Sequence, residues 1–234
     1  MEMVLFATIP TRGDHPEVLE NIVNESGLSP NQFVVIRTRE GTVVPEGVNV
    51  IDDFGPLNIQ RWWATGIKAC VLRGAQNVVV ANDDIEIDTE TFGTLNDALR
   101  VSKATLACPG ESGEHKTSSL PAMRKLVGSL WVVNPNHGLL PDERYRWYYG
   151  DDDLDIRSRR KFNGIITADV HYTHLSPGAA TSRSPEILQM LVSDLATFRR
   201  QYPMDFVYRQ VVQRTQGRTG HRIRRLLGVS EPSV

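Results

Sequence analysis

The stretch "VVVANDDIEID", which runs from Val78 to Asp88, decides the expected fold. Its first residues are uninterrupted valine and alanine, and they lead straight into Asn82, Asp83 and Asp84. A continuous apolar run is typical of a strand in a parallel sheet, because helices cover both faces of such a sheet. Ligands of these sheets bind just beyond the carboxyl ends of the strands. The stretch therefore predicts a buried parallel strand that ends at a binding site.

The rest of the first hundred residues alternates between strand and helix patterns. The expected strands are Met3–Ile9, Gln32–Arg37 and Asn49–Asp52, and the expected helices run from Pro16 to Gly27, from Asn58 to Gly74, and from Asp88 or Thr89 to about Ser102. This alternation predicts a mostly parallel sheet with helices on both faces. The polar residues that follow each strand should then meet at one edge of the sheet.

The second half of the chain gives weaker patterns. Residues 105–123 are rich in Gly, Ser and Pro and predict a flexible loop. The other expected elements are strands at 126–133 and 165–171, a short helix at 152–160, and a helix that starts at Ser184–Glu186 and buries Ile187, Leu188, Leu191, Leu195 and Phe198. A boundary near 177–184 divides the chain into a core domain, residues 1–182, and a helical, basic extension, residues 183–234.

Composition favours a soluble, cytoplasmic protein. The 234 residues carry a net charge of −2, with 40% apolar and 23% charged residues. The longest apolar run falls short of the ~20 residues that span a bilayer, the first residues lack a basic signal-peptide region, and the two cysteines form no disulfide framework. Six arginines and no acid lie between Phe206 and Arg225. Lipid, nucleic acid and the chain's own acidic face are the partners considered for this tail. We favour a solvated helix or a homo-oligomer contact, and we expect no stable nucleic-acid or membrane partner.

Three polar clusters have residue types suited to catalysis. Asn82–Asp84 offers the oxygen ligands that Mg²⁺ and Mn²⁺ prefer, although a solvated turn explains it equally well. The four carboxylates within 151–155 crowd together, which raises a pKa and suits a general base. The alternative is an exposed acidic loop balanced by the arginines that follow it. His171 and His174 are candidate metal or phosphate ligands after a strand.

Four stretches, taken in order, resemble one known family. They are "ATIPTRGDHPEVLENIV" (7–23), "NIQRWWATGIKAC" (58–70), "VVVANDDIEID" (78–88) and "LLPDERYRWYYGDDDLDIRSR" (139–159). They resemble the GT-A-fold, family 2-like inverting glycosyltransferases over roughly residues 3 to 182. The resemblance implies an α/β, Rossmann-like three-layer sandwich around a mostly parallel sheet, followed by the C-terminal helical extension.

The resemblance also implies the roles of individual residues. The donor would be a nucleotide-diphosphate sugar, and Mn²⁺ or Mg²⁺ would bridge its phosphates. Asp84 and His174 would hold the metal. Asp153, with Asp152 beside it, would be the general base that activates an acceptor hydroxyl. The nucleotide-sugar contacts expected are Pro10, Thr11, Arg12, Asp52, Asp53, Arg61, Asn82, Asp83 and Arg183. For Arg61, the alternative is a surface residue of its helix. The acceptor stays open between a glycan, a lipid-linked saccharide, a protein and a nucleobase.

Some positions depart from the family pattern. Asn82 replaces an expected carboxylate, Ala64 stands where many relatives carry Asn, and Asp152 is shorter than the usual Glu. Two other hypotheses stay open. A nucleotidyltransferase acting on sugar phosphates would use the same sheet and metal, but its Gly-rich phosphate loop is absent. A catalytically degenerate GT-A binding module would tolerate Asn82.

Overall fold

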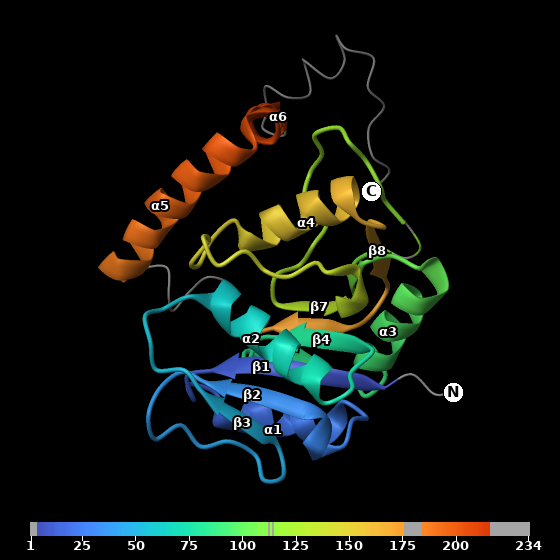
Figure 1. Ribbon diagram of the computed structural model, residues 1–234, viewed down its shortest axis with the longest axis vertical. Helices are drawn as coiled ribbons and strands as arrows, with labels where there is room; N and C mark the ends of the chain where they lie inside the picture. Colours follow the sequence, from blue (N-terminus) through green and yellow to red (C-terminus); the bar gives the residue numbers. More distant parts are fainter. Residues whose placement is uncertain (1–3, 112, 114, 176–183, 216–234) are drawn as a thin grey trace.

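The computed structural model describes residues 4–111, 113, 115–175 and 184–215. Within these residues the chain forms an α/β sandwich around a seven-stranded sheet with the order β3-β2-β1-β4-β7-β6-β8 (Figure 1). The strands of this sheet are β1 (Leu5–Thr11), β2 (Phe33–Arg37), β3 (Asn49–Asp52), β4 (Asn77–Ala81), β6 (Leu106–Pro109), β7 (Leu130–Val133) and β8 (Ile165–Ala168). The predicted three-layer, mostly parallel architecture is confirmed.

Pairing in the sheet places the carboxyl ends of four strands at one edge. β1 pairs in parallel with β2 and with β4, and β2 pairs in parallel with β3. β7 is antiparallel to both β4 and β6. Because β1 to β4 all run in the same direction, the residues that follow them lie along one edge, as the sequence predicts.

Two apolar layers explain why β4 reads as a continuous apolar run. Val79 and Ala81 belong to the layer beneath α1 (Pro16–Glu25) and α3 (Thr91–Ser102). Val78 and Val80 belong to the opposite layer, beneath α2 (Ile59–Leu72) and α4 (Gly150–Lys161). Successive strand residues point to opposite faces, so burial of both faces requires apolar residues at every position.

Short 3₁₀ turns and a two-stranded ribbon complete the core. The turns are η1 (Pro30–Gln32) and η2 (Pro135–His137), and the ribbon pairs β5 (Ile85–Ile87) with β9 (Tyr172–His174) in antiparallel fashion. The sequence patterns did not predict this ribbon: no strand was expected between Asn82–Asp84 and the next helix, and the strand from Ile165 was expected to run to His171. β8 in fact ends at Ala168.

Three other expectations are wrong in part. Residues 105–123 do not form one loop, because Leu106–Pro109 is the buried strand β6 between β7 and β8. α3 begins at Thr91, after the predicted cap, since the backbone carbonyl of Asp88 accepts from the Thr91 N–H at 3.0 Å. The buried stripe of the helix after Ser184 consists of Ile187, Met190, Asp194 and Phe198, whereas Leu188 is exposed.

A hairpin of two helices packs against α4. α5 (Pro185–Gln201) starts at the predicted Ser184–Pro185 signal, and α6 (Pro203–Thr215) follows it at once (Figure 1). Phe198 of α5 is buried with Ile156 of α4, and Asp205 of α6 accepts two hydrogen bonds from Arg160 at 2.8 Å. The predicted domain boundary at 182/183 lies outside the described residues. None of the described helices is both long and apolar enough to cross a membrane.

Candidate active site

Thr11 and Asp83 meet at the carboxyl edge, between the ends of β1 and β4. The Thr11 hydroxyl donates to Asp83 Oδ2 at 2.6 Å and accepts from the Gly13 N–H at 2.9 Å. Burial raises the pKa of Asp83, and the nearby Asp84 adds to this rise. Pro10 lies one residue earlier, beyond the last residue of β1 that pairs with β4. Two segments predicted to bind the donor are therefore in direct contact.

The β5–β9 ribbon brings His174 to Asp84. Ile85 pairs with His174 in the ladder, and the Leu175 N–H donates to the Asp84 carbonyl at 2.8 Å. His174 Nε2 lies 3.0 Å from Asp84 Oδ2, and both side chains are partly exposed. His171 is exposed instead, and its ring lies 3.6 Å from Asp88. Of the two candidate histidines, the geometry places His174 beside the acid.

Oxygen atoms without partners make this edge suitable for a divalent cation. Asn82 Oδ1 and Asp84 Oδ1 are buried, and neither has a hydrogen-bond partner among the described residues. No group of three His, Cys, Asp or Glu side chains able to hold a metal occurs in the part of the chain that the structure describes. Mg²⁺ commonly uses one or two carboxylates and takes its remaining ligands from substrate phosphates and water. Asp84, His174 and Asn82 fit that incomplete kind of site.

Four other predicted donor contacts, Arg12, Asp52, Asp53 and Arg61, form ion pairs at this edge. Arg61 clamps Asp53 through two hydrogen bonds of 2.7 and 2.9 Å. Arg37 does the same to Asp52, which lowers the pKa of that carboxyl. Arg12 lies 3.9 Å from Asp14. The Arg61 guanidinium therefore binds the loop after β3 and is not free to bind a phosphate. Arg183 lies outside the described residues.

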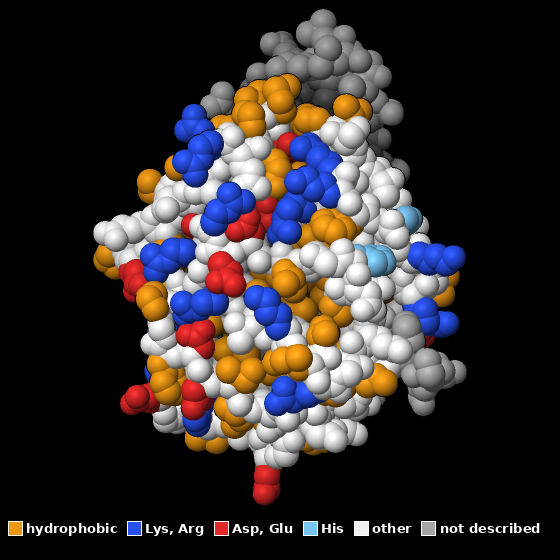
Figure 2. Space-filling model, in the orientation of Figure 1, with side chains coloured by type: hydrophobic (Ala, Val, Ile, Leu, Met, Phe, Trp, Pro, Cys, Tyr) orange, Lys and Arg blue, Asp and Glu red, His pale blue; other side chains and the backbone are white. Residues whose placement is uncertain are grey.

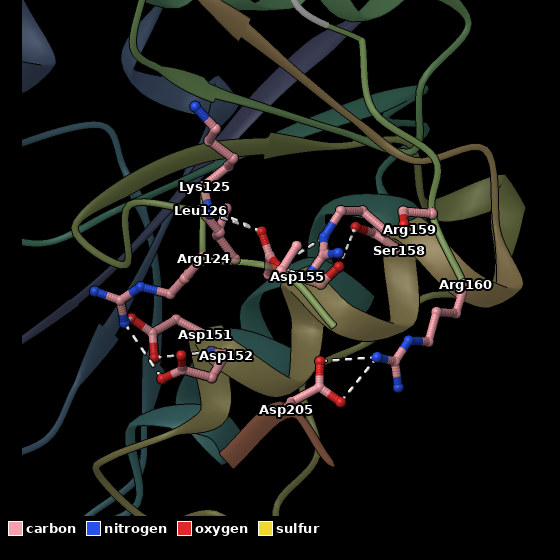
Figure 3. Close-up of polar contacts among 12 residues, drawn as sticks. Arg124, Lys125, Leu126, Asp151, Asp152, Asp155, Ser158, Arg159, Arg160 and Asp205 are labelled. Atoms are coloured by element: carbon pink, nitrogen blue, oxygen red, sulfur yellow. Dashed lines mark hydrogen bonds and ion pairs between the residues drawn. The ribbon is translucent and has the colours of Figure 1, made fainter. Parts of the chain in front are cut away.

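The acids of α4 differ in their surroundings. Asp155 is fully buried, accepts from Arg159 at 2.5 and 2.9 Å, and also accepts from the N–H groups of Lys125 and Leu126 (Figure 3). Asp151 and Asp152 lie at the start of the helix, where Arg124 contacts both (Figure 3). Asp152 also pairs with Arg209 of α6.

Asp153 is the predicted base, and its surroundings do not match that role. Its side chain is fully buried, and both oxygens are occupied. Arg157 donates at 2.7 Å, the Tyr202 hydroxyl at 2.7 Å and Gln201 at 3.2 Å. A base must reach its proton at hydrogen-bond distance. Asp152, the other predicted acid, also has a partner on each oxygen, Arg209 and Arg124, but it lines a pocket of about 340 Å³.

The two residues just before β7, Gly128 and Ser129, contact the two acidic clusters. The Asn82 N–H donates to the Ser129 carbonyl at 2.9 Å. The neighbouring Gly128 lies against Asp151, since a methyl group in place of its hydrogen would come 2.9 Å from Asp151 Oδ2. Gly150, at the start of α4, likewise lies against Gln60 in the first turn of α2. The two clusters are about seventy residues apart in the chain, and neighbouring residues, Gly128 and Ser129, contact one cluster each.

Several residues of this region were not among the predicted site residues. Asp194 of α5 is fully buried and accepts backbone N–H groups of 146, 147 and 148 at 2.8 to 3.2 Å. Arg124 and Arg209 reach the α4 acids from distant segments. Asp194 could have been identified from the sequence as the single acid on the otherwise apolar face of its helix. No sequence signal pairs the two arginines with their acids.

Comparisons with known proteins give the fold a wider context. No protein-family model matches the chain, and no curated protein matches it either. Among solved structures, S. aureus TarS (residues 1–349) is similar with a TM-score of 0.53 and 11% identity, over 85% of this chain and 72% of that one. A structure of the same TarS fragment in complex with UDP gives the same values.

A second similar structure contains a sugar nucleotide and a metal. It is the mannosyltransferase PcManGT from Pyrobaculum calidifontis in complex with GDP-Man and Mn²⁺, with a TM-score of 0.50 and 12% identity. The similarity covers 84% of this chain and 64% of that one. At such identities the likeness concerns the fold, and the chain has the GT-A fold that the resemblance implies.

Proposed function

We propose that the protein is an inverting, metal-dependent glycosyltransferase that moves a sugar from a nucleotide-diphosphate sugar to an acceptor hydroxyl. One observation carries this proposal. Two carboxylate clusters from distant parts of a GT-A chain contact neighbouring residues, and one of them keeps buried oxygens, on Asn82 and Asp84, without partners among the described residues. Structures with the same fold contain UDP, or GDP-Man with Mn²⁺, which supports a sugar nucleotide as donor.

The donor side of the proposed reaction uses the edge formed by β1 and β4. Asp84 and His174 would hold Mn²⁺ or Mg²⁺, with Asn82 close by, and the bound ion would offset charge on the departing diphosphate. Thr11, Arg12 and Asp52 would border the nucleoside. Asp83 is held by the Thr11 hydroxyl and would fix the orientation of the strand end. Arg61 and Asp53 would support this edge as an ion pair.

The acceptor side uses the start of α4. A base takes the proton of the acceptor hydroxyl while that oxygen attacks the anomeric carbon and the bond to the diphosphate breaks. Direct displacement of this kind inverts the anomeric carbon and needs no covalent sugar–enzyme bond. We propose Asp152 for this role, because it lines a pocket that an acceptor can enter, together with its two arginine partners Arg124 and Arg209, whereas Asp153 is fully buried. Asp153 would instead anchor the helix to Gln201 and Tyr202.

The experiment that tests this proposal is a panel of UDP-, GDP-, TDP- and CDP-sugars with Mn²⁺, read by release of the nucleotide diphosphate. We expect release with one nucleotide class, and loss of release when EDTA removes the metal. Asp84→Ala should abolish release. Asp88→Ala is the matched control, since Asp88 is an exposed acid four residues along. Turnover of a nucleotide triphosphate, with no turnover of any nucleotide sugar, would overturn the proposal.

A further inference from the structure

A pocket of about 340 Å³ lies between the start of α4 and the α5–α6 hairpin. Three aromatic side chains, two arginines and one acid give it its chemistry: Tyr149, Phe198, Phe206, Arg124, Arg209 and Asp152. In Figure 2, Lys and Arg side chains gather on both sides of a small acidic group, in the region where Figure 1 places α4. Neither Asp84 nor His174 lines this pocket, so it is separate from the proposed metal site.

Arg209 carries a positive charge that is only partly compensated. The residue is 8% exposed, its Nε donates to the Ala122 carbonyl at 3.3 Å, and one terminal nitrogen pairs with Asp152. The other terminal nitrogen is buried and has no partner among the described residues. Burial lowers the pKa of Arg209 to about 10, and repulsion from Arg124 contributes. A buried donor without an acceptor is destabilising, and native proteins rarely leave one unless a ligand or water completes it.

Arg124 provides the second guanidinium. Its side chain is 41% exposed, and one nitrogen contacts both Asp151 and Asp152. Its exposure leaves it able to bind a ligand from the open side of the pocket. Guanidinium groups match the spacing of two oxygens on phosphate or carboxylate, so a pair of them favours an anionic ligand over a neutral one.

Tyr149 forms part of the wall in a strained backbone conformation. Its φ of 62° and ψ of −1° are in the left-handed region, which bulky residues rarely adopt. Two contacts enforce this conformation: Gly150 lies against Gln60, and Asp194 binds the N–H groups of the preceding segment, 146–148. The Tyr149 ring stacks on Phe198 at 5.0 Å between centroids. Strain held in place by its surroundings is typical of ligand sites.

We propose that this pocket is the acceptor site, and that the acceptor is a sugar or polyol bearing a phosphate or carboxylate that Arg124 and Arg209 bind. The apolar C–H face of the acceptor would lie against the half-buried rings of Tyr149 and Phe206. Its hydroxyl would then stand next to Asp152, the base of the proposed reaction. The acceptor role of the pocket rests on the proposed function. Binding of the anion does not, and it can be measured independently.

The test is a calorimetric titration of glucose 6-phosphate, glucuronate and glucose into the full chain. EDTA is present, so that no anion can bind through a divalent ion at Asp84. We expect the two anions to bind with dissociation constants of about 1 mM or below, and glucose to bind at least about tenfold more weakly. Arg124→Gln should remove at least about tenfold of the anion affinity, because it deletes one of the two forks. Because the Arg124 side chain is partly exposed, we expect this variant to fold as the wild type does.

Arg200→Gln is the matched control, because it makes the same charge change at the exposed end of α5, away from the pocket lining. It should bind both anions as the wild type does. Anions that bind no tighter than glucose, or an Arg124→Gln protein that binds them normally, would overturn the acceptor proposal.

A second titration, with UDP or GDP and Mn²⁺, separates the two proposals. If nucleotide binds in an Asp84-dependent manner and the sugar anions do not bind, the acceptor proposal fails while the proposed function stands. If the anions bind through Arg124 and no nucleotide binds, the pocket stands as an anion site and the proposed function fails.

Discussion

The two acidic clusters have opposite kinds of surroundings. At the end of β4, Asn82 and Asp84 keep buried oxygens that no described group contacts, and Asp84 shares its other oxygen with a histidine. At the start of α4, every carboxylate has an arginine partner among the described residues. An unpaired buried oxygen needs a cation or donor from outside, whereas a paired carboxylate is already compensated. The carboxylate oxygens of the first cluster therefore need a ligand, whereas those of the second are paired within the fold, and Arg209 there keeps a buried nitrogen without a partner among the described residues.

The largest expected effect separates two acids within the second cluster. Asp152→Asn should lower kcat about 10²- to 10⁴-fold, the usual range for loss of a general base, while nucleotide binding stays unchanged. Steady-state kinetics with the preferred nucleotide sugar measure this. Asp153→Asn should mainly lower the free energy of unfolding and leave kcat closer to that of the wild type, because the Asp153 oxygens bind Tyr202 and Gln201. A larger kcat loss in Asp153→Asn than in Asp152→Asn would reverse the assignment.

The next effect tests whether the paired acids are structural. Arg159→Ala should destabilise the fold by about 3–5 kcal/mol, because it leaves Asp155 charged and buried without its partner. Urea unfolding followed by circular dichroism measures the difference. Arg100→Ala is the control, since its pair with Asp97 is exposed and contributes about 0–1 kcal/mol. Equal effects in the two variants would contradict a structural role for Asp155.

Substitution of Asp194 should give a smaller loss of stability together with a higher KM for the acceptor. Asp194→Asn removes the charge that accepts three backbone N–H groups, and each hydrogen bond to a charged group contributes about 1.5–3 kcal/mol. The amide oxygen keeps part of this, so we expect a loss of about 2 kcal/mol and a raised KM for acceptor. Asp97→Asn, an exposed helical acid, should change neither quantity. An unchanged acceptor KM in Asp194→Asn would show that the 146–148 segment does not shape the acceptor pocket.

The smallest effect is a pKa change in the Arg37–Asp52 ion pair, at the ends of β2 and β3. The hydrogen bonds from Arg37 lower the pKa of Asp52 below its ordinary 3.8. A lowered folded pKa contributes stability above the unfolded pKa, and this contribution is lost as pH falls through the folded pKa. Arg37→Gln should return the pKa of Asp52 toward 3.8, as measured by NMR titration of its side-chain carboxyl. No movement of this pKa would mean that the ion pair does not form in solution.

Local patterns predicted most of the sheet well. The apolar run of β4 identified a strand covered on both faces, and Asn58 and Pro185 marked helix starts that the structure contains. The same reasoning failed for β6, because this strand has only four residues beside a Gly- and Ser-rich segment. The β5–β9 ribbon was missed because its strands have three residues each and depend on pairing across the chain.

The candidate site was harder to predict than the fold, because its contacts join distant residues. The pairing of Asp152 with Arg209 spans 57 positions, and that of Asp194 with the N–H of Trp147 spans 47. Residue types alone could identify four crowded carboxylates as candidate bases. They could not show that burial and three partners occupy Asp153 while Asp152 faces a pocket. Access to a pocket, which residue type does not reveal, distinguishes the proposed base from the proposed anchor.

The most direct test of the central claim is calorimetric binding of UDP and GDP to the wild-type chain, with Mn²⁺ and with EDTA. The claim is that the unpaired oxygens at the end of β4 are completed by a divalent cation and a nucleotide diphosphate. We predict that one nucleotide binds in the presence of Mn²⁺, that EDTA or Asp84→Ala weakens it at least about a hundredfold, and that Asp88→Ala binds it normally. Binding that is equally tight with EDTA, or in Asp84→Ala, would contradict the account.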